Sequence, residues 1–369
     1  MNERAAYIAL ALAPGIGSAR LQNLLAACGS AIGALSAPLA FLGSVPGLSA
    51  AAASTIKERR VADGERVLDA AAKAGIAVLT PADEGFPAQF REIPEPPELL
   101  FAVGRMELLE RPAVAVVGSR DHTAYGAQVC TMIGAGAARA GLAVVSGMAR
   151  GLDAVAHVSA LDAGGASIGV LGNGIGVIYP AANRALYERM SADGLLLTEF
   201  PPGERPHAGG FPRRNRLISA LARVTIVVEA APGSGALITA GTALDQGRDV
   251  LAVPGPITSR TSGGTNALIR DGAHPLLELN DLFQFYGEAV PEAAPERTAQ
   301  RTLPPDLDPQ ERALAELLSS GERQLDVLAL SARRSVADVL SLLASLEIQG
   351  LVERKPGNVF ELRAASCEL

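Results

Sequence analysis

Apolar residues gather in six short runs in the middle of the chain, with longer stretches of mixed polarity between them. The runs are nearly continuous Val, Ile, Leu and Ala, which is typical of parallel strands buried on both faces. Helical patterns fall between most of the runs, so the sequence predicts an α/β fold with a parallel sheet covered by helices on both sides. The expected strands are 113–118, 142–147, 167–172, 195–200, 224–230 and 249–255.

The pattern changes before this core. Residues 1–75 are Ala-rich and predict helices, with breaks at "PGIG" (14–17) and "VPGLS" (45–49). The segment "PGIGSARLQNLL" fits a helix-hairpin-helix, whose Gly hairpin offers backbone N–H groups to a phosphate; a purely structural helical module fits equally well. Residues 76–112 carry Pro94, Pro96 and Pro97, which favour extended chain over helix. We group this connector with the core as one domain, residues 76–285.

The pattern changes again after the core. Residues 286–308 are rich in Pro, Ala and charge, as is typical of a linker. Residues 309–369 predict helices near 309–319, 323–331 and 335–349, and then two short strands joined at Pro356 and Gly357. Three helices followed by a β-wing indicate a winged helix.

Composition narrows the function classes. The net charge of −7 gives no global affinity for nucleic acid, so any such site is a local patch. Three scattered cysteines and four histidines without ligand spacing predict neither a metal site nor a disulfide framework. No apolar run reaches the ~18 residues that suggest a membrane span, and Glu3 stands where a signal peptide is basic. We expect a cytoplasmic protein without a membrane partner.

Four of the six expected strands end in Gly, at the edge where open α/β sheets bind ligands. After the first strand, Gly118, Ser119 and Arg120 lead into a helix. Glycine lets a ligand approach the backbone, and an arginine can grip a phosphate with two N–H donors. A capped turn in which Arg120 pairs with Asp121 is the alternative explanation.

The turn after the second strand repeats this design. Asp153 and His157 follow it, four residues apart on one face of the next helix. No nucleophile stands at a recognisable spacing from them, so we expect them to support a site and not to catalyse. The residues expected to bind at this turn are Ser146, Gly147, Arg150 and Gly151.

Two later Gly-rich loops open helices and can expose N–H groups to an anion, although either is also compatible with a simple turn. The "GNGIG" segment lacks the full dinucleotide fingerprint, and no GxxxxGK[ST] occurs, so we expect no cofactor. The candidate ligand-binding residues of the two loops are Ser234, Gly235, Thr239, Gly263, Gly264 and Asn266.

The segment "FPRRNRLISAL" places Arg213, Arg214, Asn215 and Arg216 at the start of a helix. Each cation there costs roughly 0.3–1 kcal/mol against the helix dipole. Anions between the helix N–H groups and the guanidinium groups remove that cost, so the segment predicts a site for a line of phosphates. The alternative is neutralisation by an acidic residue, with Glu199, Glu204 and Glu229 as the candidates.

These features together predict a site for a line of phosphates, as in a polyanionic strand, with strong salt dependence. Base stacking is expected to be modest, because Tyr179, Phe200 and Phe211 are the available platforms.

The segments "VAVVGSR", "VVSGMARGLDAVAH", "LGNGIGVIYPAAN", "FPRRNRLISAL", "GSGALITA" and "GGTNALIRDGA" closely resemble the DNA-processing protein A family (DprA or Smf) in order and spacing. The resemblance implies an extended Rossmann-like domain that binds single-stranded DNA through Arg120 and the turn at Arg213, Arg214 and Arg216. It also implies an N-terminal helical domain (SAM-like or helix-hairpin-helix-like), a winged helix, a homodimer, and loading of the RecA recombinase during natural transformation. It implies no catalytic residue.

The sequence departs from the family at one position and leaves two other functions to weigh. Some members carry Lys directly after "YP", where this chain has Ala181, so a phosphate contact is absent or comes from Arg184. The related "lonely guy" phosphoribohydrolases place a catalytic Glu where this chain has Thr239 or Ala240, so an enzyme lacks its acid/base group.

The winged helix is the second alternative, as a reader of duplex DNA. Its third helix, "SVADVLSLLASLEIQG", carries Asp338 and Glu347 and is preceded by Arg333 and Arg334. A helix that reads a groove presents Arg, Lys, Asn or Gln to bases and phosphates. This helix suits packing or a protein partner better.

Overall fold

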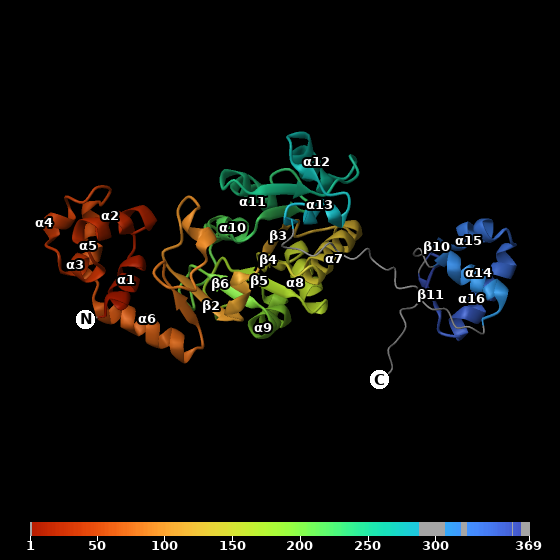
Figure 1. Cartoon of the computed structure of the whole chain (residues 1–369), viewed down its shortest axis with the longest axis horizontal. Helices are drawn as coiled ribbons and strands as arrows, with labels where there is room; N and C mark the ends of the chain where they lie inside the picture. The colour runs from red at the N-terminus through yellow and green to blue at the C-terminus, as the bar shows by residue number, and fades with distance from the viewer. Residues whose placement is uncertain (1, 288–306, 319–322, 356, 363–369) are drawn as a thin grey trace. The chain divides into compact units, whose positions relative to one another are not determined.

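The computed structural model describes residues 2–287, 307–318, 323–355 and 357–362, which form two compact units, 1–293 and 294–369 (Figure 1). Each unit has hydrophobic cores of its own. Most of the linker expected at 286–308 lies outside the described residues.

A nine-stranded sheet forms the centre of the first unit, in the order β1-β2-β6-β5-β4-β3-β7-β8-β9 (Figure 1). The six strands expected from the apolar runs are all present and parallel to their neighbours among them. They are β3 (Ala113–Val117), β4 (Ala143–Ser146), β5 (Ala166–Val170), β6 (Leu195–Thr198), β7 (Val224–Val227) and β8 (Asp249–Ala252).

The connector adds two strands that the sequence pattern did not assign to the sheet. β1 (Ala77–Leu79) and β2 (Leu100–Gly104) pair with each other, and β2 pairs with β6, both antiparallel. At the other edge, β9 (His274–Pro275) pairs with β8 in parallel. Pro94, Pro96 and Pro97 lie in bends and irregular chain before β2, with Glu95 at φ of +53°, so the expected extended chain occurs in β1 and β2 and not at the prolines themselves.

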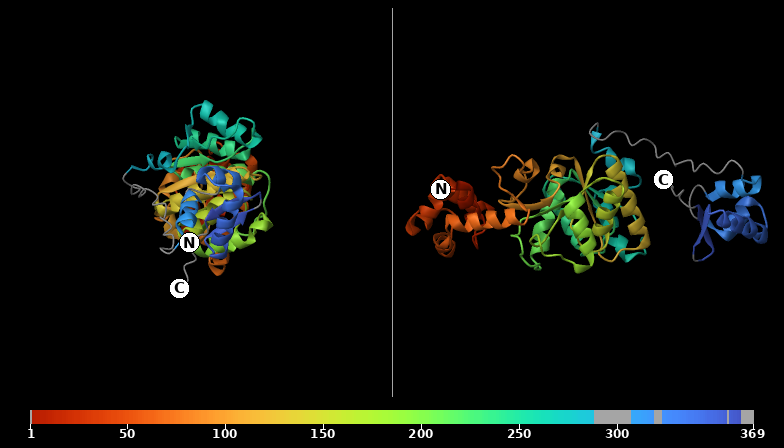
Figure 2. Two further views of the ribbon diagram at one scale, coloured as in Figure 1. Left: turned by 90° about the vertical axis from the view of Figure 1, so that its right-hand side faces the viewer. Right: turned by 90° about the horizontal axis from the view of Figure 1, so that it is seen from below.

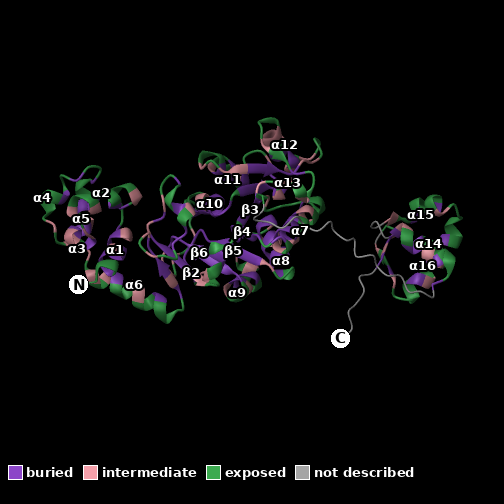
Figure 3. Cartoon of the chain, viewed as in Figure 1, coloured by how far each residue is buried: buried purple, intermediate pink, exposed green. Residues whose placement is uncertain are grey.

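Helices cover both faces of the sheet (Figures 1 and 2). Val114 and Val116 of β3 point to the face covered by α7 (Ala124–Arg139) and α8 (Leu152–Asp162), while Ala115 and Val117 point to the face covered by α10 (Gly210–Leu221) and α11 (Gly235–Asp245). The strands are buried along their length (Figure 3). The remaining helices of this region are α9 (Arg184–Asp193), α12 (Gly263–Arg270) and α13 (Leu279–Phe283).

The strand order reverses at the centre of the sheet. The chain runs from β3 outward through β4, β5 and β6, and then returns to place β7 and β8 on the other side of β3. Loops after β3 and β7 therefore leave in opposite directions, which opens a crevice at their carboxyl ends.

The N-terminal helices surround a core of their own, with the two expected breaks between α1 and α2 and between α4 and α5. Arg20 joins the two Gly hairpins, because its guanidinium donates to the backbone carbonyls of Gly15 and Gly47. The helices are α1 (Glu3–Ala11), α2 (Ser18–Cys28), α3 (Ala31–Ser36), α4 (Leu39–Leu42), α5 (Ala50–Glu58) and α6 (Val61–Lys73).

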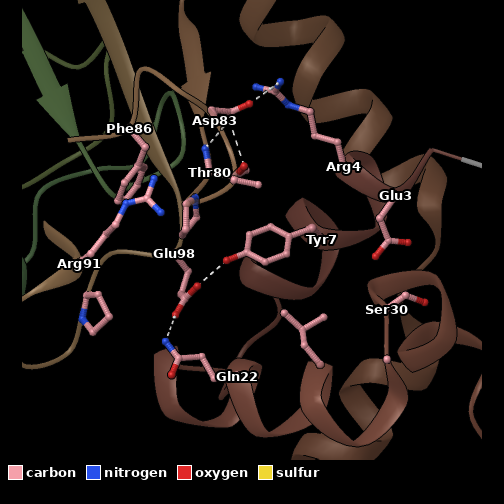
Figure 4. Close-up of a pocket in the computed structure, with 15 residues that line it drawn as sticks. Glu3, Arg4, Tyr7, Gln22, Ser30, Thr80, Asp83, Phe86, Arg91 and Glu98 are labelled. Carbon is pink, nitrogen blue, oxygen red and sulfur yellow. Dashed lines mark hydrogen bonds and ion pairs between the residues drawn. The ribbon is translucent and has the colours of Figure 1, made fainter. Parts of the chain in front are cut away.

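Two carboxylates attach this helical part to the connector, around a cavity of about 800 Å³ (Figure 4). Glu98 accepts hydrogen bonds from Tyr7 of α1 and from Gln22 of α2. Asp83 lies 3.0 Å from the Arg4 guanidinium. Burial, reinforced by the Glu98 carboxylate, raises the pKa of Tyr7, so its phenol stays a donor.

The second unit is a three-helix domain with a three-stranded sheet in the order β10-β12-β11. Its second helix begins slightly later than expected, because residues 323–324 form a strand. The elements are α14 (Pro309–Leu318), β10 (Arg323–Gln324), α15 (Leu325–Ala332), α16 (Val336–Ile348), β11 (Val352–Lys355) and β12 (Val359–Leu362).

Candidate nucleic-acid interface

Two neighbouring cavities, of about 310 and 560 Å³, lie at the carboxyl ends of the central strands. They share Arg120, Ala149, Phe211 and Arg214 as a common wall. Loops after β3, β4 and β5 and the start of α10 supply the first cavity, and the start of α11 extends the second. The sequence-predicted residues brought together here are Gly118, Arg120, Gly147, Arg150, Asp153, Arg214, Asn215, Ser234, Gly235 and Thr239.

Arg120 is exposed between the two cavities. Its guanidinium carbon lies 5.9 Å from the centroid of the Phe211 ring. Asp121 pairs with Arg150 instead, at 3.6 Å, so the alternative of an Arg120–Asp121 pair does not hold. Within the described part of the chain, the Arg120 side chain has no hydrogen bond or ion pair. Its five N–H donors are free to bind an anion.

Two of the three expected aromatic platforms line the first cavity. The Tyr179 and Phe211 rings lie 5.6 Å apart with a 34° tilt, and Tyr179 is 47% exposed. Phe200 does not join them, since it is 5% exposed and the Arg213 guanidinium covers its ring at 5.4 Å. The prediction of Phe200 as a stacking platform is therefore wrong.

Arg214 forms the buried part of the shared wall, with 5% of its surface exposed. Its guanidinium donates to the backbone carbonyls of Gly147 and Val170, at the ends of β4 and β5. Burial lowers the pKa of Arg214 to about 10; Asp153 opposes this shift and Arg120 adds to it. Arg214 remains a cation at neutral pH, and its Nη1 and Nε donors hold it against the protein. Binding of a phosphate by Arg214 stays a prediction.

Arg213 and Arg216 turn towards Glu199 and line neither cavity. One Glu199 carboxylate oxygen lies 2.5 Å from Arg216, and the other lies 3.5 Å from Arg213. The Glu199 side chain is 4% exposed, and that of Arg213 is 57% exposed. The alternative of neutralisation by an acidic residue thus holds for Glu199, so the structure does not show three free guanidinium groups in a line. Phosphate binding by these arginines stays a prediction. The pairing of Glu199 with Arg213 and Arg216, together with the carbonyl contacts of Arg214, explains how three arginines fit at a helix start.

Three polar residues at and after the end of β4 are buried, and one of them, Asp153, lines the second cavity. Ser146 is fully buried and donates to the Val116 carbonyl at 2.6 Å, so it cannot contact a ligand as predicted. Burial raises the pKa of Asp153, while Arg214 and backbone N–H groups lower it. Burial, followed by the charge of Arg214, lowers the pKa of His157 to about 3. The His157 ring is therefore neutral at physiological pH, with Nδ1 2.7 Å from the Ser167 hydroxyl.

Two glycines let these loops pack closely. A Cβ atom on Gly147 would lie 2.6 Å from both Arg214 and Asp153. Gly151 has φ of +83°, and a Cβ there would lie 2.5 Å from the Ser119 carbonyl. Ser119 itself bonds the backbone of Asp121 in its own turn. Ser119 and Gly151 thus shape the loops without lining the cavities.

The two Gly-rich loops that follow β7 and β8 differ in whether they reach the second cavity. Ser234 caps α11 by accepting from the Ala236 N–H, and the start of this helix faces the second cavity. The "SGGTN" loop lies elsewhere: the Asn266 amide bonds Gly255, and the Gly264 N–H bonds the Ala230 carbonyl. Its predicted place in the site is corrected for Gly263, Gly264 and Asn266.

Asn183 was missed from the sequence, and Glu229 was assigned a different role there, as a possible partner of the α10 arginines. The Asn183 amide donates to the carbonyls of Met148 and Ala149, which fixes a wall of the first cavity. Buried Glu229 accepts from the Thr123 N–H and hydroxyl at the start of α7. A polar residue directly after an apolar run is the signal that could have identified Glu229; Asn183 carries no such signal. Arg184 lies 3.9 Å from Glu188 and lines neither cavity.

The fold defines a chain with a Rossmann-like domain and a winged helix. A family profile described as DNA recombination-mediator protein A matches residues 77–287, and one described as the DprA winged helix domain matches residues 296–358. The chain belongs to the DNA recombination-mediator protein A (DprA/Smf) family.

Comparisons with individual relatives support the same family. Protein Smf of Synechocystis is 35% identical over 318 residues, covering 77% of this chain and 80% of that protein. The putative DNA processing protein DprA of Mycobacterium tuberculosis is 39% identical over 306 residues, covering 79% and 78%. The X-ray structure of DprA from Streptococcus pneumoniae superposes with a TM-score of 0.69 at 33% identity, covering 77% of this chain and 98% of that one.

A second solved structure with a similar fold comes from a relative whose description names single-stranded DNA. The Helicobacter pylori DNA processing protein A, whose structure is described as giving insight into its single-stranded DNA binding mode, superposes with a TM-score of 0.53 at 29% identity. The match covers 58% of this chain and 97% of that one. No helix in the described ranges of this chain is long and apolar enough to cross a bilayer.

Proposed function

We propose that this protein binds single-stranded DNA at the two cavities, with the strand crossing the wall formed by Arg120 and Phe211. The observation that carries the proposal is the free Arg120 guanidinium beside two aromatic rings. The guanidinium suits a phosphate and the rings suit an unpaired base, a combination typical of single-strand binding with little sequence preference. The single-strand binding described for the Helicobacter pylori relative supports the same ligand.

A salt-titrated binding measurement tests the proposal. Single- and double-stranded oligonucleotides of one sequence are compared for the native chain and for Arg120→Ala. We expect the native chain to prefer the single strand, and Arg120→Ala to bind about tenfold more weakly with a salt slope smaller by about 1.

The matched control is Arg66→Ala, which removes an exposed arginine from α6, remote from both cavities. It should bind like the native chain. Equal affinity of Arg120→Ala and the native chain at every salt concentration would reject the site.

We propose further that the protein acts in the cytoplasm as a homodimer that protects incoming single strands and loads a RecA recombinase onto them in natural transformation. Membership of the family supports this role. The test is RecA filament assembly on DNA coated with a single-strand-binding protein, with and without this chain. Unchanged assembly kinetics would argue against loading while leaving single-strand binding intact.

We propose a binding protein and not an enzyme. Thr239 donates to the Gly235 carbonyl and Ala240 is fully buried, so the position that would carry the carboxylate of a phosphoribohydrolase has no acid/base group. Incubation with nucleoside monophosphates should release no free base. Turnover of any of them would favour the enzyme.

A further inference from the structure

The outer side of α16 is aliphatic and is not covered by the described residues of the second unit. Val336, Leu340, Ala344 and Ile348 recur every four residues and follow one side of the helix. All four are exposed, Ile348 to 88%. Exposed aliphatic patches of this kind are typical of protein–protein contacts.

The same side lacks the groups that read DNA. Ala337 and Ser341 flank the aliphatic residues and are also exposed. The charged side chains of α16 are Asp338 and Glu347, both acidic, and the helix contains no Arg, Lys, Asn or Gln. A DNA duplex bound here would place phosphates against these aliphatic side chains, which is unfavourable. A helix with an apolar face would instead bury them against other apolar side chains.

We propose that α16 pairs antiparallel with α16 of a second copy of this chain. The charges at its two ends favour this partner and this direction. Arg334 precedes the helix and Glu347 lies in its last turn; among the described residues, neither side chain has a hydrogen bond or ion pair. An antiparallel pair brings Arg334 of each copy to Glu347 of the other, twice, while a parallel pair aligns like charges.

The register that joins these charges also fits the side-chain sizes. In a pair with two-fold symmetry, placing Arg334 opposite Glu347 sets Ala337 opposite Ala344 and Leu340 opposite Ser341. Within the helix, small residues therefore face each other or face a large one, while Ile348 lies opposite Arg333, which precedes the partner helix. That arrangement lets two helices approach to the ~8–10 Å separation of ordinary helix packing. The contact is independent of the DNA-binding cavities.

Disulfide trapping in the full chain tests the pairing. Ser341→Cys lies next to the two-fold axis of this register, and the background carries Cys28→Ser and Cys367→Ser; Cys130 is buried. Under mild oxidation we expect Ser341→Cys to give at least about fivefold more cross-linked dimer than the control Ala313→Cys, which is exposed on α14. Equal yields for the two variants would overturn the proposal, and α16 would then face another partner or solvent.

Charge reversal tests the direction independently. In the Ser341→Cys chain, Arg334→Glu or Glu347→Arg alone should lower the cross-linking yield roughly three- to tenfold, because each creates two like-charge contacts. The double variant should restore the yield. Single variants that cross-link normally, or a double variant as poor as either single one, would overturn the antiparallel pairing. Both positions are exposed, so neither change disturbs the domain core.

Discussion

The loop after β3 and the start of α10 both bring arginine to the same edge of the sheet, but they use it differently. Arg120 leaves its guanidinium free beside Phe211. At α10, Arg214 donates to buried carbonyls, and Glu199 pairs with Arg213 and Arg216. Arginines at a ligand-binding edge therefore divide into those that contact the ligand and those that build the walls, and their burial and partners decide which.

The largest expected effect comes from Arg214. Arg214→Ala leaves Asp153 buried without its cation and two carbonyls without donors, so unfolding free energy should fall by about 3–5 kcal/mol. Urea denaturation measures this loss of unfolding free energy. The control is Arg120→Ala, whose free energy of unfolding should stay within about 0.5 kcal/mol of the native value. An Arg214→Ala chain of native stability would contradict the wall-building role.

A smaller effect is expected at the aromatic rings. Phe211→Ala removes the platform shared by Tyr179 and Arg120, so single-strand binding should weaken by about 1–3 kcal/mol. Fluorescence anisotropy with a labelled oligonucleotide measures this loss. Phe200→Leu is the matched control, because Phe200 is buried away from both cavities. Equal losses for the two variants would show that packing, and not stacking, is responsible.

The pH dependence of stability tests the buried residues under the site. The pKa of His157 is about 3 in the folded chain and near 6.5 in the unfolded chain, so the unfolded state binds more protons between these values. His157 therefore favours folding above pH 6.5, and this contribution is lost as the pH falls towards 3. His157→Asn should reduce the slope of stability against pH in that window by up to ~1.4 kcal/mol per pH unit. Parallel curves from denaturation at several pH values would contradict the burial of a neutral ring.

The smallest effect is expected at Arg213. Its side chain is largely exposed and 3.5 Å from Glu199, so Arg213→Ala should change stability by less than about 1 kcal/mol. Since it lines neither cavity, DNA binding should weaken far less than in Arg120→Ala. A loss of affinity equal to that of Arg120→Ala would extend the interface to α10 and reduce the contrast drawn here.

Local pattern was sufficient for much of the fold. The six apolar runs predicted the six parallel strands, and the helix and turn signals predicted the winged helix, because burial on both faces and capping depend on neighbouring residues. The sequence also predicted that Arg120, Gly147 and Ser234 lie at one edge of the sheet, since the carboxyl ends of parallel strands lie on the same side. The motif order was enough to identify the family.

The tertiary structure alone decided which polar groups are free. Arg214 meets carbonyls from β4 and β5, Glu199 reaches α10 from the end of β6, and Asn266 bonds a loop after β8. These partners are far apart in the chain, and a charged side chain reads the same in sequence whether it is buried or exposed. The free energy of burying a charge depends on contacts that exist only after folding, so sequence could place the arginines at this edge but could not assign their roles.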